Sequence, residues 1–197
     1  MASAPERRLA AVLYAELRNF TRLSEVLQPD KVLALANEFF SLAARAVTGN
    51  TGKVLLVHND SLVAAFAAGD AKQFTGEALK AAQAIQGEFA PIGERWQKEY
   101  GLPAAVALGL HTGETVFGMA GPQGALQFVA FGDCVSIAER LVHRARTGEI
   151  VLSLDVMKAL GAAVATLRAE ELPALELGKR PPLPIYGMLL ETRLDFT

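Results

Sequence analysis

The chain has 197 residues, of which 51% are hydrophobic, and a formal net charge of −2. That length suits one sizeable α/β domain with its own core, and the interspersed charge gives no sign of bulk nucleic-acid or acidic-membrane binding. A single cysteine, Cys134, excludes an internal disulfide and fits a reducing cytoplasm. No stretch reaches the ~20 apolar residues of a membrane span, and the N-terminus lacks a secretion signal. We therefore expect one cytoplasmic domain over residues 1–197, without direct membrane insertion.

The first half of the chain alternates strand-like and helix-like segments. Residues 8–17 are a strand candidate, and Pro29 opens an amphipathic helix that stops at Gly49 and Asn50. The stretch KVLLVHNDSLVAAF, residues 53–66, is typical of a tight hairpin that bends across its HND tripeptide. Residues 71–99 then predict a second long helix.

The second half contains more strand signals. AAVALGLHTGETVFGMAG predicts a strand, a glycine turn and another strand, and LQFVAF a further strand. Gly132 opens a helix that runs to about Arg144, followed by strand-like GEIVLS, a short helix in LDVMKALG and a closing strand in LPIYGMLLE.

This order favours one mostly antiparallel sheet with helices on one face. Such an arrangement is an α+β sandwich related to the ferredoxin-like, split βαβ class. We expect its core over about residues 8–160 and a strand-containing C-terminal extension over residues 161–197.

Two acids stand at the ends of predicted strands. Glu16 ends the first strand, and Asp60 lies at the bend of the hairpin. Strands separated by one crossover helix commonly become neighbours, so the two carboxylates are predicted to meet at one sheet edge. A pair of carboxylates is what Mg²⁺ usually takes from a protein. A solvated strand end and an ordinary turn aspartate explain the same spacing, and both interpretations stay open here.

The stretch RNFTRLSE follows the first acid directly. Thr21 and Ser24 are candidate helix caps, and the backbone N–H groups of the RNFT corner suit a phosphate. Most capped loops bind nothing, so this signal is weak by itself.

The stretch FGDCVSIAERL carries a hydroxyl and a guanidinium. On a helix, Ser136 and Arg140 lie i,i+4 on the same face. Together they suit a ribose oxygen and a phosphate, for which arginine is the natural partner. The alternative is a surface arginine that pairs with Glu139 or a neighbouring helix. His111 has no second ligand at metal spacing and predicts a packed histidine, while Cys134 predicts a small buried thiol.

Taken together, four segments resemble one family. VLYAELRNFTRLSE, TGKVLLVHNDSLVAAF, GLHTGETVFGMAG and FVAFGDCVSIAERL occur in the order and spacing of the class III adenylyl/guanylyl cyclase catalytic domain. The resemblance covers about residues 8–160 and implies that family's fold and a place in cyclic-nucleotide signalling.

The resemblance also implies roles for single residues. The family's first metal aspartate falls on Glu16 and its second on Asp60, which implies Mg²⁺ or Mn²⁺ as cofactor. Its transition-state arginine falls on Arg140, and its ribose-orienting asparagine on Ser136. The extra methylene of Glu16 moves that carboxylate by about one C–C bond, where octahedral contacts of ~2.1 Å are required.

The part that reads the purine base departs further from the family. The base-reading lysine falls on Leu56, and the base-reading aspartate or threonine on Val129; neither side chain offers a hydrogen bond to a purine edge. Phe20 and Thr21 match the family's phosphate-binding corner.

Three functions follow from these residues. The first is a degenerate cyclase domain, a dimeric regulatory module that binds ATP or GTP. The second is an active adenylate cyclase that converts ATP to cAMP, and the third is a partner-binding scaffold without nucleotide. In the family, sites form across a head-to-tail dimer, which implies a homodimer here or a heterodimer with an intact cyclase.

Overall fold

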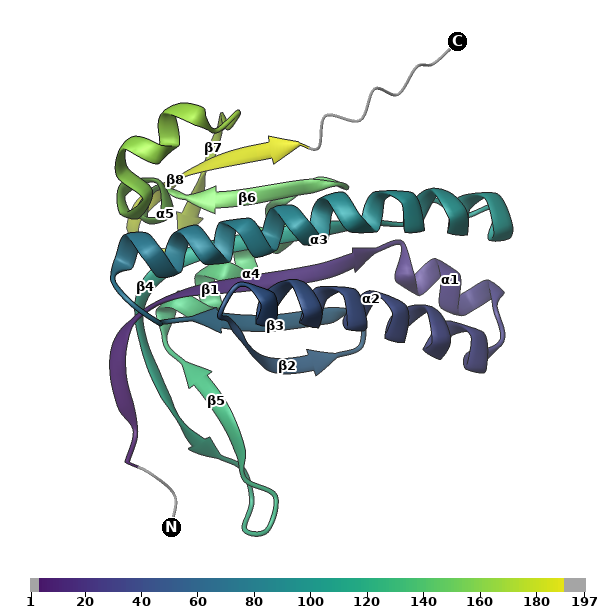
Figure 1. Cartoon of the computed structure of the whole chain (residues 1–197), viewed down its shortest axis with the longest axis horizontal. Coiled ribbons are helices and arrows are strands. Elements are labelled where there is room, and N and C mark those ends of the chain that lie inside the picture. Colours follow the sequence, from purple (N-terminus) through teal and green to yellow (C-terminus); the bar gives the residue numbers. More distant parts are fainter. Residues whose placement is uncertain (1–3, 190–197) are drawn as a thin grey trace.

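A computed structural model describes residues 4–189 of the chain. Within these residues one eight-stranded sheet has the order β2-β3-β1-β4-β6-β8-β7, and β5 pairs with β4 outside that order (Figure 1). The strands are β1 (Glu6–Arg18), β2 (Lys53–His58), β3 (Ser61–Phe66), β4 (Ala105–Ala120), β5 (Gln127–Phe131), β6 (Glu149–Ser153), β7 (Glu170–Leu177) and β8 (Arg180–Leu189). The helices are α1 (Phe20–Val26), α2 (Pro29–Gly49), α3 (Ala71–Tyr100), α4 (Asp133–Arg144) and α5 (Leu154–Leu160), with a short 3-10 helix at Gly161–Thr166.

The mostly antiparallel sheet that the sequence predicts is confirmed. β1 lies between β3 and β4 and pairs antiparallel with both. β2 pairs with β3, β5 with β4, and β8 with both β6 and β7, again antiparallel. Within the described residues, the parallel pair is β4 with β6, for which α4 supplies the crossover.

Helices cover both faces of the sheet, so the expectation of helices on one face is wrong. Leu13 and Leu17 of β1 belong to the main core with Phe39 of α2 and Phe89 of α3. Val12, on the other side of the same strand, packs in a second cluster with residues of α4. β1 is therefore apolar on both sides of its pleat, and one helical layer cannot bury it.

The predicted long helices have the expected ends. α2 begins with Pro29 at its first turn and ends before Asn50. At the start of α3 the side chain of Asp70 accepts a hydrogen bond from the Gln73 backbone N–H, and Gly101 ends the helix with φ 70°. Capping residues and helical periodicity thus determine both elements.

The short helix α1 is capped differently from the prediction. Asn19, in the left-handed conformation with φ 65°, precedes it and gives no side-chain cap. Thr21 lies inside the helix, and the Ser24 hydroxyl donates to the Phe20 carbonyl at 3.0 Å. Neither Thr21 nor Ser24 is a cap, because the turn at Asn19 places both residues within the helix.

β4 is one continuous strand rather than the predicted strand, turn and strand. A Cβ built on Gly109 would lie 2.4 Å from the Val142 amide nitrogen and 2.5 Å from the Ala138 carbonyl oxygen. Gly109 therefore allows the backbone of α4 to lie directly on β4. Gly113, in the HTGE segment where the turn was expected, pairs with Ala10 inside the continuous β1–β4 ladder. A second difference is β7, a strand where the sequence showed only an acidic run; the last residues of the predicted closing strand lie outside the described chain.

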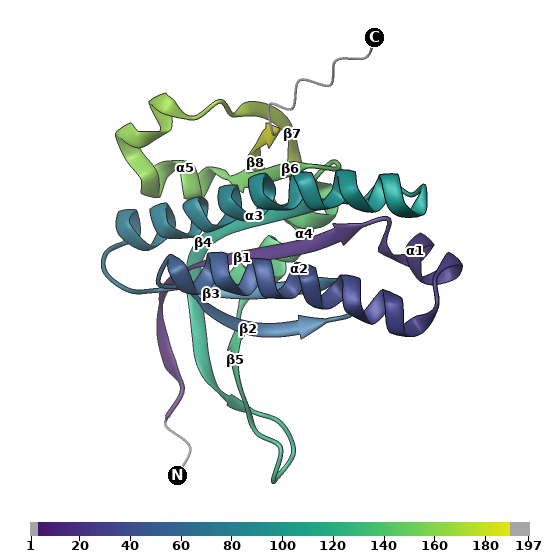
Figure 2. The same ribbon diagram turned by 45° about the vertical axis from the view of Figure 1, so that its right-hand side comes forward.

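The β4–β5 hairpin extends from the body of the molecule beside the start of β1 (Figures 1 and 2). The rings of Phe117 and Phe128 stack across it with centroids 6.0 Å apart. Lys53 of β2 places its Nζ 3.6 Å from the Phe128 centroid, and the guanidinium of Arg8 lies 5.3 Å from that of Phe117. These cation–π contacts hold the hairpin against β1 and β2.

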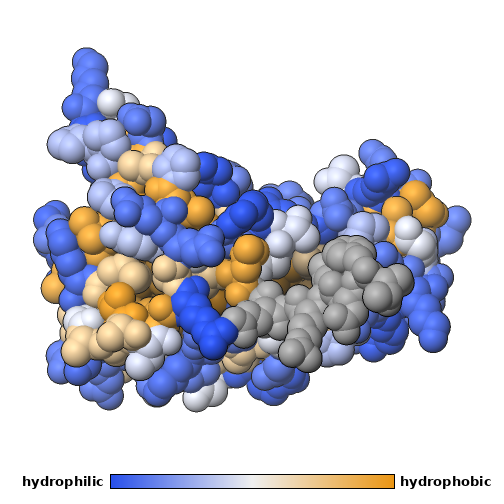
Figure 3. All heavy atoms as spheres, turned by 90° about the horizontal axis from the view of Figure 1, so that it is seen from above, coloured by the Kyte–Doolittle hydropathy of each residue, from blue (hydrophilic) through white to orange (hydrophobic). Residues whose placement is uncertain are grey.

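The outer surface is mixed in character. Seen from above, hydrophobic side chains form small patches between hydrophilic ones (Figure 3). Within the described part of the chain, no helix combines the length and apolarity that a membrane crossing requires.

Replacement of Gly109 by alanine tests the contact between β4 and α4. We expect Gly109→Ala to lower the free energy of unfolding by about 1–3 kcal/mol, because the new methyl group meets backbone atoms that cannot rotate away. Gly87→Ala is the matched control: nothing lies within 4 Å of its Cβ position on α3, so helix propensity predicts about 0.5–1 kcal/mol of added stability. Urea denaturation measures both, and an unchanged Gly109→Ala midpoint would contradict the close contact.

The thiol of Cys134 gives a second test. Cys134 lies in the first turn of α4 with its side chain buried toward the sheet, and burial raises the pKa of its thiol to about 11. Because the thiolate is the reactive form, we expect a disulfide reagent at pH 8 to leave Cys134 unmodified in the native protein. In guanidinium chloride the same reagent should titrate one thiol per chain. Rapid native labelling at pH 8 would show that the helix does not protect this thiol.

Candidate functional site

Glu16 and Arg18 form an ion pair on the face of the sheet that α4 covers. Residues two apart on a strand share a face, so Tyr14, Glu16 and Arg18 all point to this side. Arg18 Nη1 donates to Glu16 Oε1, and Nε2 of His143 lies 3.7 Å from Glu16 Oε2. The Glu16 side chain is only 14% exposed and that of Arg18 22%. Glu16 is therefore a largely buried carboxylate with a cation already beside it.

Arg18 also connects β1 to the end of α4. Its Nη2 donates to the carbonyl oxygen of Val142 and, at 3.1 Å, to that of Ala145. Carbonyls at a helix C-terminus lack intrahelical partners and carry partial negative charge, so a guanidinium is well placed there. The sequence reasoning missed this role for Arg18, although its position two residues after Glu16 was visible.

Asp60 lies in the turn directly before β3, the strand that pairs with β1 at Glu16. Glu16 pairs with Ser61 across β1 and β3, and the Leu17 amide donates to the Asp60 carbonyl at 2.9 Å. The Asp60 carboxylate accepts a hydrogen bond from the Ser61 hydroxyl at 3.2 Å, and Asn59 makes the turn with φ 51°. The pairing of β1 with β3 thus brings the backbone of Asp60 beside that of Leu17, and the meeting of the two carboxylates stays a prediction.

A divalent cation requires ligands whose negative charge or lone pairs are available to it. Among residues 4–189, no group of three or more His, Cys, Asp or Glu side chains is arranged to hold a metal ion. Of the two predicted ligands, Glu16 has its charge balanced by Arg18. As arranged, Glu16 is paired with Arg18 and does not present a free carboxylate to a divalent cation.

Leu56 and Val129 line one apolar pocket of about 210 Å³. It lies between β2, β5 and the start of α4, on the same face of the sheet as Glu16. Its lining is apolar apart from one phenol and one amide: Tyr14, Leu55, Leu56, Val63, Gln127, Val129, Ala130, Phe131 and Val135. Leu56 and Phe131 are exposed at its rim. Two residues 73 positions apart in the chain are thus brought together, as the resemblance implied.

Tyr14 connects this pocket to the acid end of β1. Burial raises the pKa of its phenol, and the negative charges of Glu139 and Glu16 raise it further. Tyr14 therefore remains a neutral hydrogen-bond donor beside a pocket with few polar groups. Sequence reasoning overlooked Tyr14, although its alternation with Glu16 along β1 was a usable signal.

Ser136 and Arg140 lie on the exposed side of α4, outside that pocket. They share one helical face, as predicted from their spacing. Arg140 donates through Nη2 to the backbone carbonyl of Glu176 on β7, so its partner is a strand rather than Glu139 or a helix.

The β7–β8 hairpin contacts both ends of this part of α4. Arg180 donates to both carboxylate oxygens of Asp133 at 2.5 and 2.9 Å, at the helix N-terminus. Its guanidinium holds the pKa of Asp133 below the ordinary value. Leu175 and Ile185 pack with Ile137 and Leu141 in one cluster. The C-terminal hairpin is therefore part of the surroundings of Ser136 and Arg140.

The other predicted residues lie elsewhere. Phe20 packs against the main core and, with Asn59, lines a surface pocket of about 360 Å³, while Thr21 is exposed. His111 is buried, its Nδ1 lies 2.7 Å from the Ser153 hydroxyl, and burial lowers its pKa. It is thus a packed histidine, as expected.

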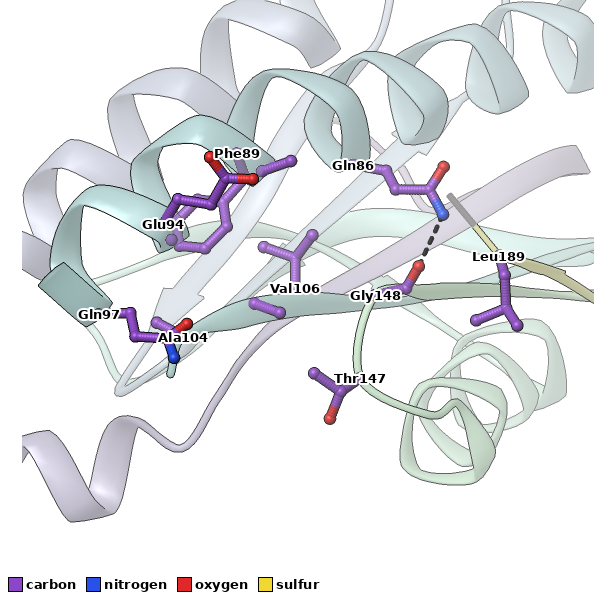
Figure 4. A pocket seen from close by; sticks show the side chains of 12 residues that line it. Gln86, Phe89, Glu94, Gln97, Ala104, Val106, Thr147, Gly148 and Leu189 are labelled. Atoms are coloured by element: carbon purple, nitrogen blue, oxygen red, sulfur yellow. Dashed lines mark hydrogen bonds between the residues drawn. The ribbon is translucent and has the colours of Figure 1, made fainter. Parts of the chain in front are cut away.

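A larger cavity of about 370 Å³ lies between α3, the start of β4 and the loop before β6 (Figure 4). Gln86 crosses one side of it and donates to the Gly148 carbonyl at 2.8 Å. Its described lining contains none of the residues predicted for a site. Size alone therefore does not mark the candidate site, which is the smaller pocket beside Glu16.

Comparison with known proteins agrees with this architecture. The adenylyl cyclase CyaB from P. aeruginosa superimposes with a TM-score of 0.87 at 20% identity, covering 99% of this chain and 100% of that one. The guanylyl cyclase Cya2 gives 0.83 at 22% identity, with 98% of each chain covered. These likenesses establish the α+β cyclase fold.

Sequence relatives point the same way. Adenylate cyclase 1 of Rhizobium meliloti (strain 1021) is 31% identical over 137 residues, which cover 68% of this chain but only 20% of that protein. The chain thus spans a small part of the curated relatives it matches. Residues 3–181 match the family described as the adenylate and guanylate cyclase catalytic domain. Together with the shared fold, this match places the chain in the class III adenylyl/guanylyl cyclase catalytic domain family.

Proposed function

We propose that this cyclase domain is degenerate and acts as a dimeric, nucleotide-binding regulatory module in cyclic-nucleotide signalling. The observation that carries the proposal is the pocket beside Tyr14, where Leu56 and Val129 replace the side chains with which the family reads a purine. An apolar pocket of about 210 Å³ accepts a flat aromatic ring but offers few hydrogen bonds to tell one base from another. Binding without base-selective turnover follows from that chemistry.

The charged groups support the same reading. Glu16 is neutralised by Arg18, and Arg140 is bound to the Glu176 carbonyl within the same chain. A phosphoryl-transfer site requires such groups to be free for metal and phosphate, because positioning and charge stabilisation carry most of the catalysis. Here intramolecular partners occupy both groups.

The dimer follows from where the parts of the site lie. Glu16 is on β1, Asp60 is in the turn before β3 and the pocket lies between β2 and β5, whereas Ser136 and Arg140 are on the outer side of α4. One chain does not bring both sets together, and a second copy in head-to-tail contact supplies the missing half to each. A heterodimer with an intact cyclase would do the same with one complete site.

A second candidate is an active adenylate cyclase that makes cAMP from ATP. It is favoured by the acids Glu16 and Asp60, by Arg140, and by the adenylate cyclase relative at 31% identity. This candidate needs Arg18 and Glu176 to release their partners when substrate binds.

A turnover assay separates the two candidates. Purified protein is incubated with ATP or GTP and Mn²⁺, and cAMP or cGMP is measured beside an Asp60→Ala variant. We expect no product above that control, because the predicted metal and phosphate ligands are already paired. Product that depends on Asp60 would instead establish the active cyclase.

Calorimetry with a non-hydrolysable ATP analogue measures whether the domain binds nucleotide at all. The proposal expects binding to the native protein, with heat that disappears when Val129→Arg fills the pocket. Thermal unfolding of that variant shows whether it is folded. Absence of binding to a folded native protein would leave the partner-binding scaffold as the function.

Base selectivity gives a further prediction. The native domain should bind ATP and GTP analogues with affinities within about threefold of each other, since apolar walls discriminate polar edges poorly. The double variant Leu56→Lys with Val129→Asp restores side chains of the family's type and should create at least about a tenfold preference for one purine. Leu33→Lys, an exposed position on α2 outside the pocket, is the charge control. A strong preference in the native protein would contradict the proposal.

A further inference from the structure

We propose that Arg18 is the resident cation of Glu16 and competes with divalent cations for this carboxylate. In this view the guanidinium of β1 takes the place that the family gives to a metal ion, and a metal binds here only when Glu16 leaves Arg18. The inference concerns the cation at Glu16 and holds whether or not the chain binds or converts a nucleotide.

The ion pair between Glu16 and Arg18 is largely buried. With 14% of the Glu16 side chain and 22% of the Arg18 side chain exposed, water screens the interaction poorly. A carboxylate this far from water requires a positive partner or several donors. Arg18 is the partner in direct contact with Oε1.

The guanidinium of Arg18 is held in one orientation. Its other amino group is already bound to the carbonyls of Val142 and Ala145 at the end of α4. The planar group is therefore held in place before it meets Glu16, so the ion pair loses little side-chain entropy on forming. A lysine has a single ammonium group and does not reproduce both contacts with one geometry.

The side chain of Glu16 is longer than that of the family's aspartate. Glu16 and Arg18 are two apart on one face of a strand, which separates their Cα atoms by about 6.5–7 Å. The extra methylene of glutamate, relative to the family's aspartate, extends the carboxylate by about one C–C bond along the surface. The same change that moves the acid from the family's metal position thus brings it to Arg18.

Manganese binding without nucleotide tests the inference. Free Mn²⁺ is followed by electron paramagnetic resonance as it is titrated into the full chain. Arg18→Gln should bind Mn²⁺ about tenfold more tightly than the native protein, because the freed carboxylate lacks its counter-ion. Arg18→Lys should give an intermediate gain. Arg22→Gln removes the same charge from the exposed side of α1 and should change the affinity by less than about twofold.

A double variant assigns the effect to Glu16. Adding Glu16→Gln to the Arg18→Gln variant should remove the whole gain in affinity. Equal or weaker Mn²⁺ binding by the Arg18 variants, or a gain that persists without the Glu16 carboxylate, would overturn the proposal. Circular dichroism establishes whether each variant is folded. If Arg18→Gln is not folded, the Mn²⁺ affinity of Arg18→Lys tests the proposal in its place. Because no nucleotide is present, failure here is distinct from failure of the nucleotide-binding proposal.

Discussion

The pairing of β1 with β4 is the constraint on which the rest of the structure depends. It runs without interruption from Glu6 opposite Phe117 to Arg18 opposite Ala105. This long register determines the pleat of β1 and therefore which side chains face α2 and α3 and which face α4. A shift of one residue would turn the acid of β1 into the main core and the leucines beside it toward α4. The position of the candidate site is thus a consequence of strand register.

Helix α4 is bound at both ends and on its outer side by hydrogen bonds and ion pairs of arginine side chains. Arg18 binds its last carbonyls, Arg180 pairs with Asp133 at its first turn, and Arg140 bonds outward to β7. The groups that resemble catalytic ones are therefore also the groups that hold the helix in place.

Much of the fold could be predicted from the sequence, because its signals are local. Pro29, Asp70 and Gly101 mark helix ends, and the HND tripeptide marks the hairpin. Gly113 misled, since a glycine within a continuous strand has the same local appearance in the sequence as one that permits a turn. In the candidate site, the meeting of Leu56 with Val129 followed from the resemblance alone. The contacts of Arg18 with α4 could not be foreseen, because their partners lie 124 and 127 residues away.

Gly109 has a mechanical consequence for α4. The helix backbone at Ala138 and Val142 rests on β4 with no side chain between them, so the helix cannot slide along the strand without collision. The contact lies near the middle of Asp133–Arg144. Arg18 holds the last carbonyls of the helix and Arg180 holds Asp133 in its first turn, so α4 is fixed at three points along its length.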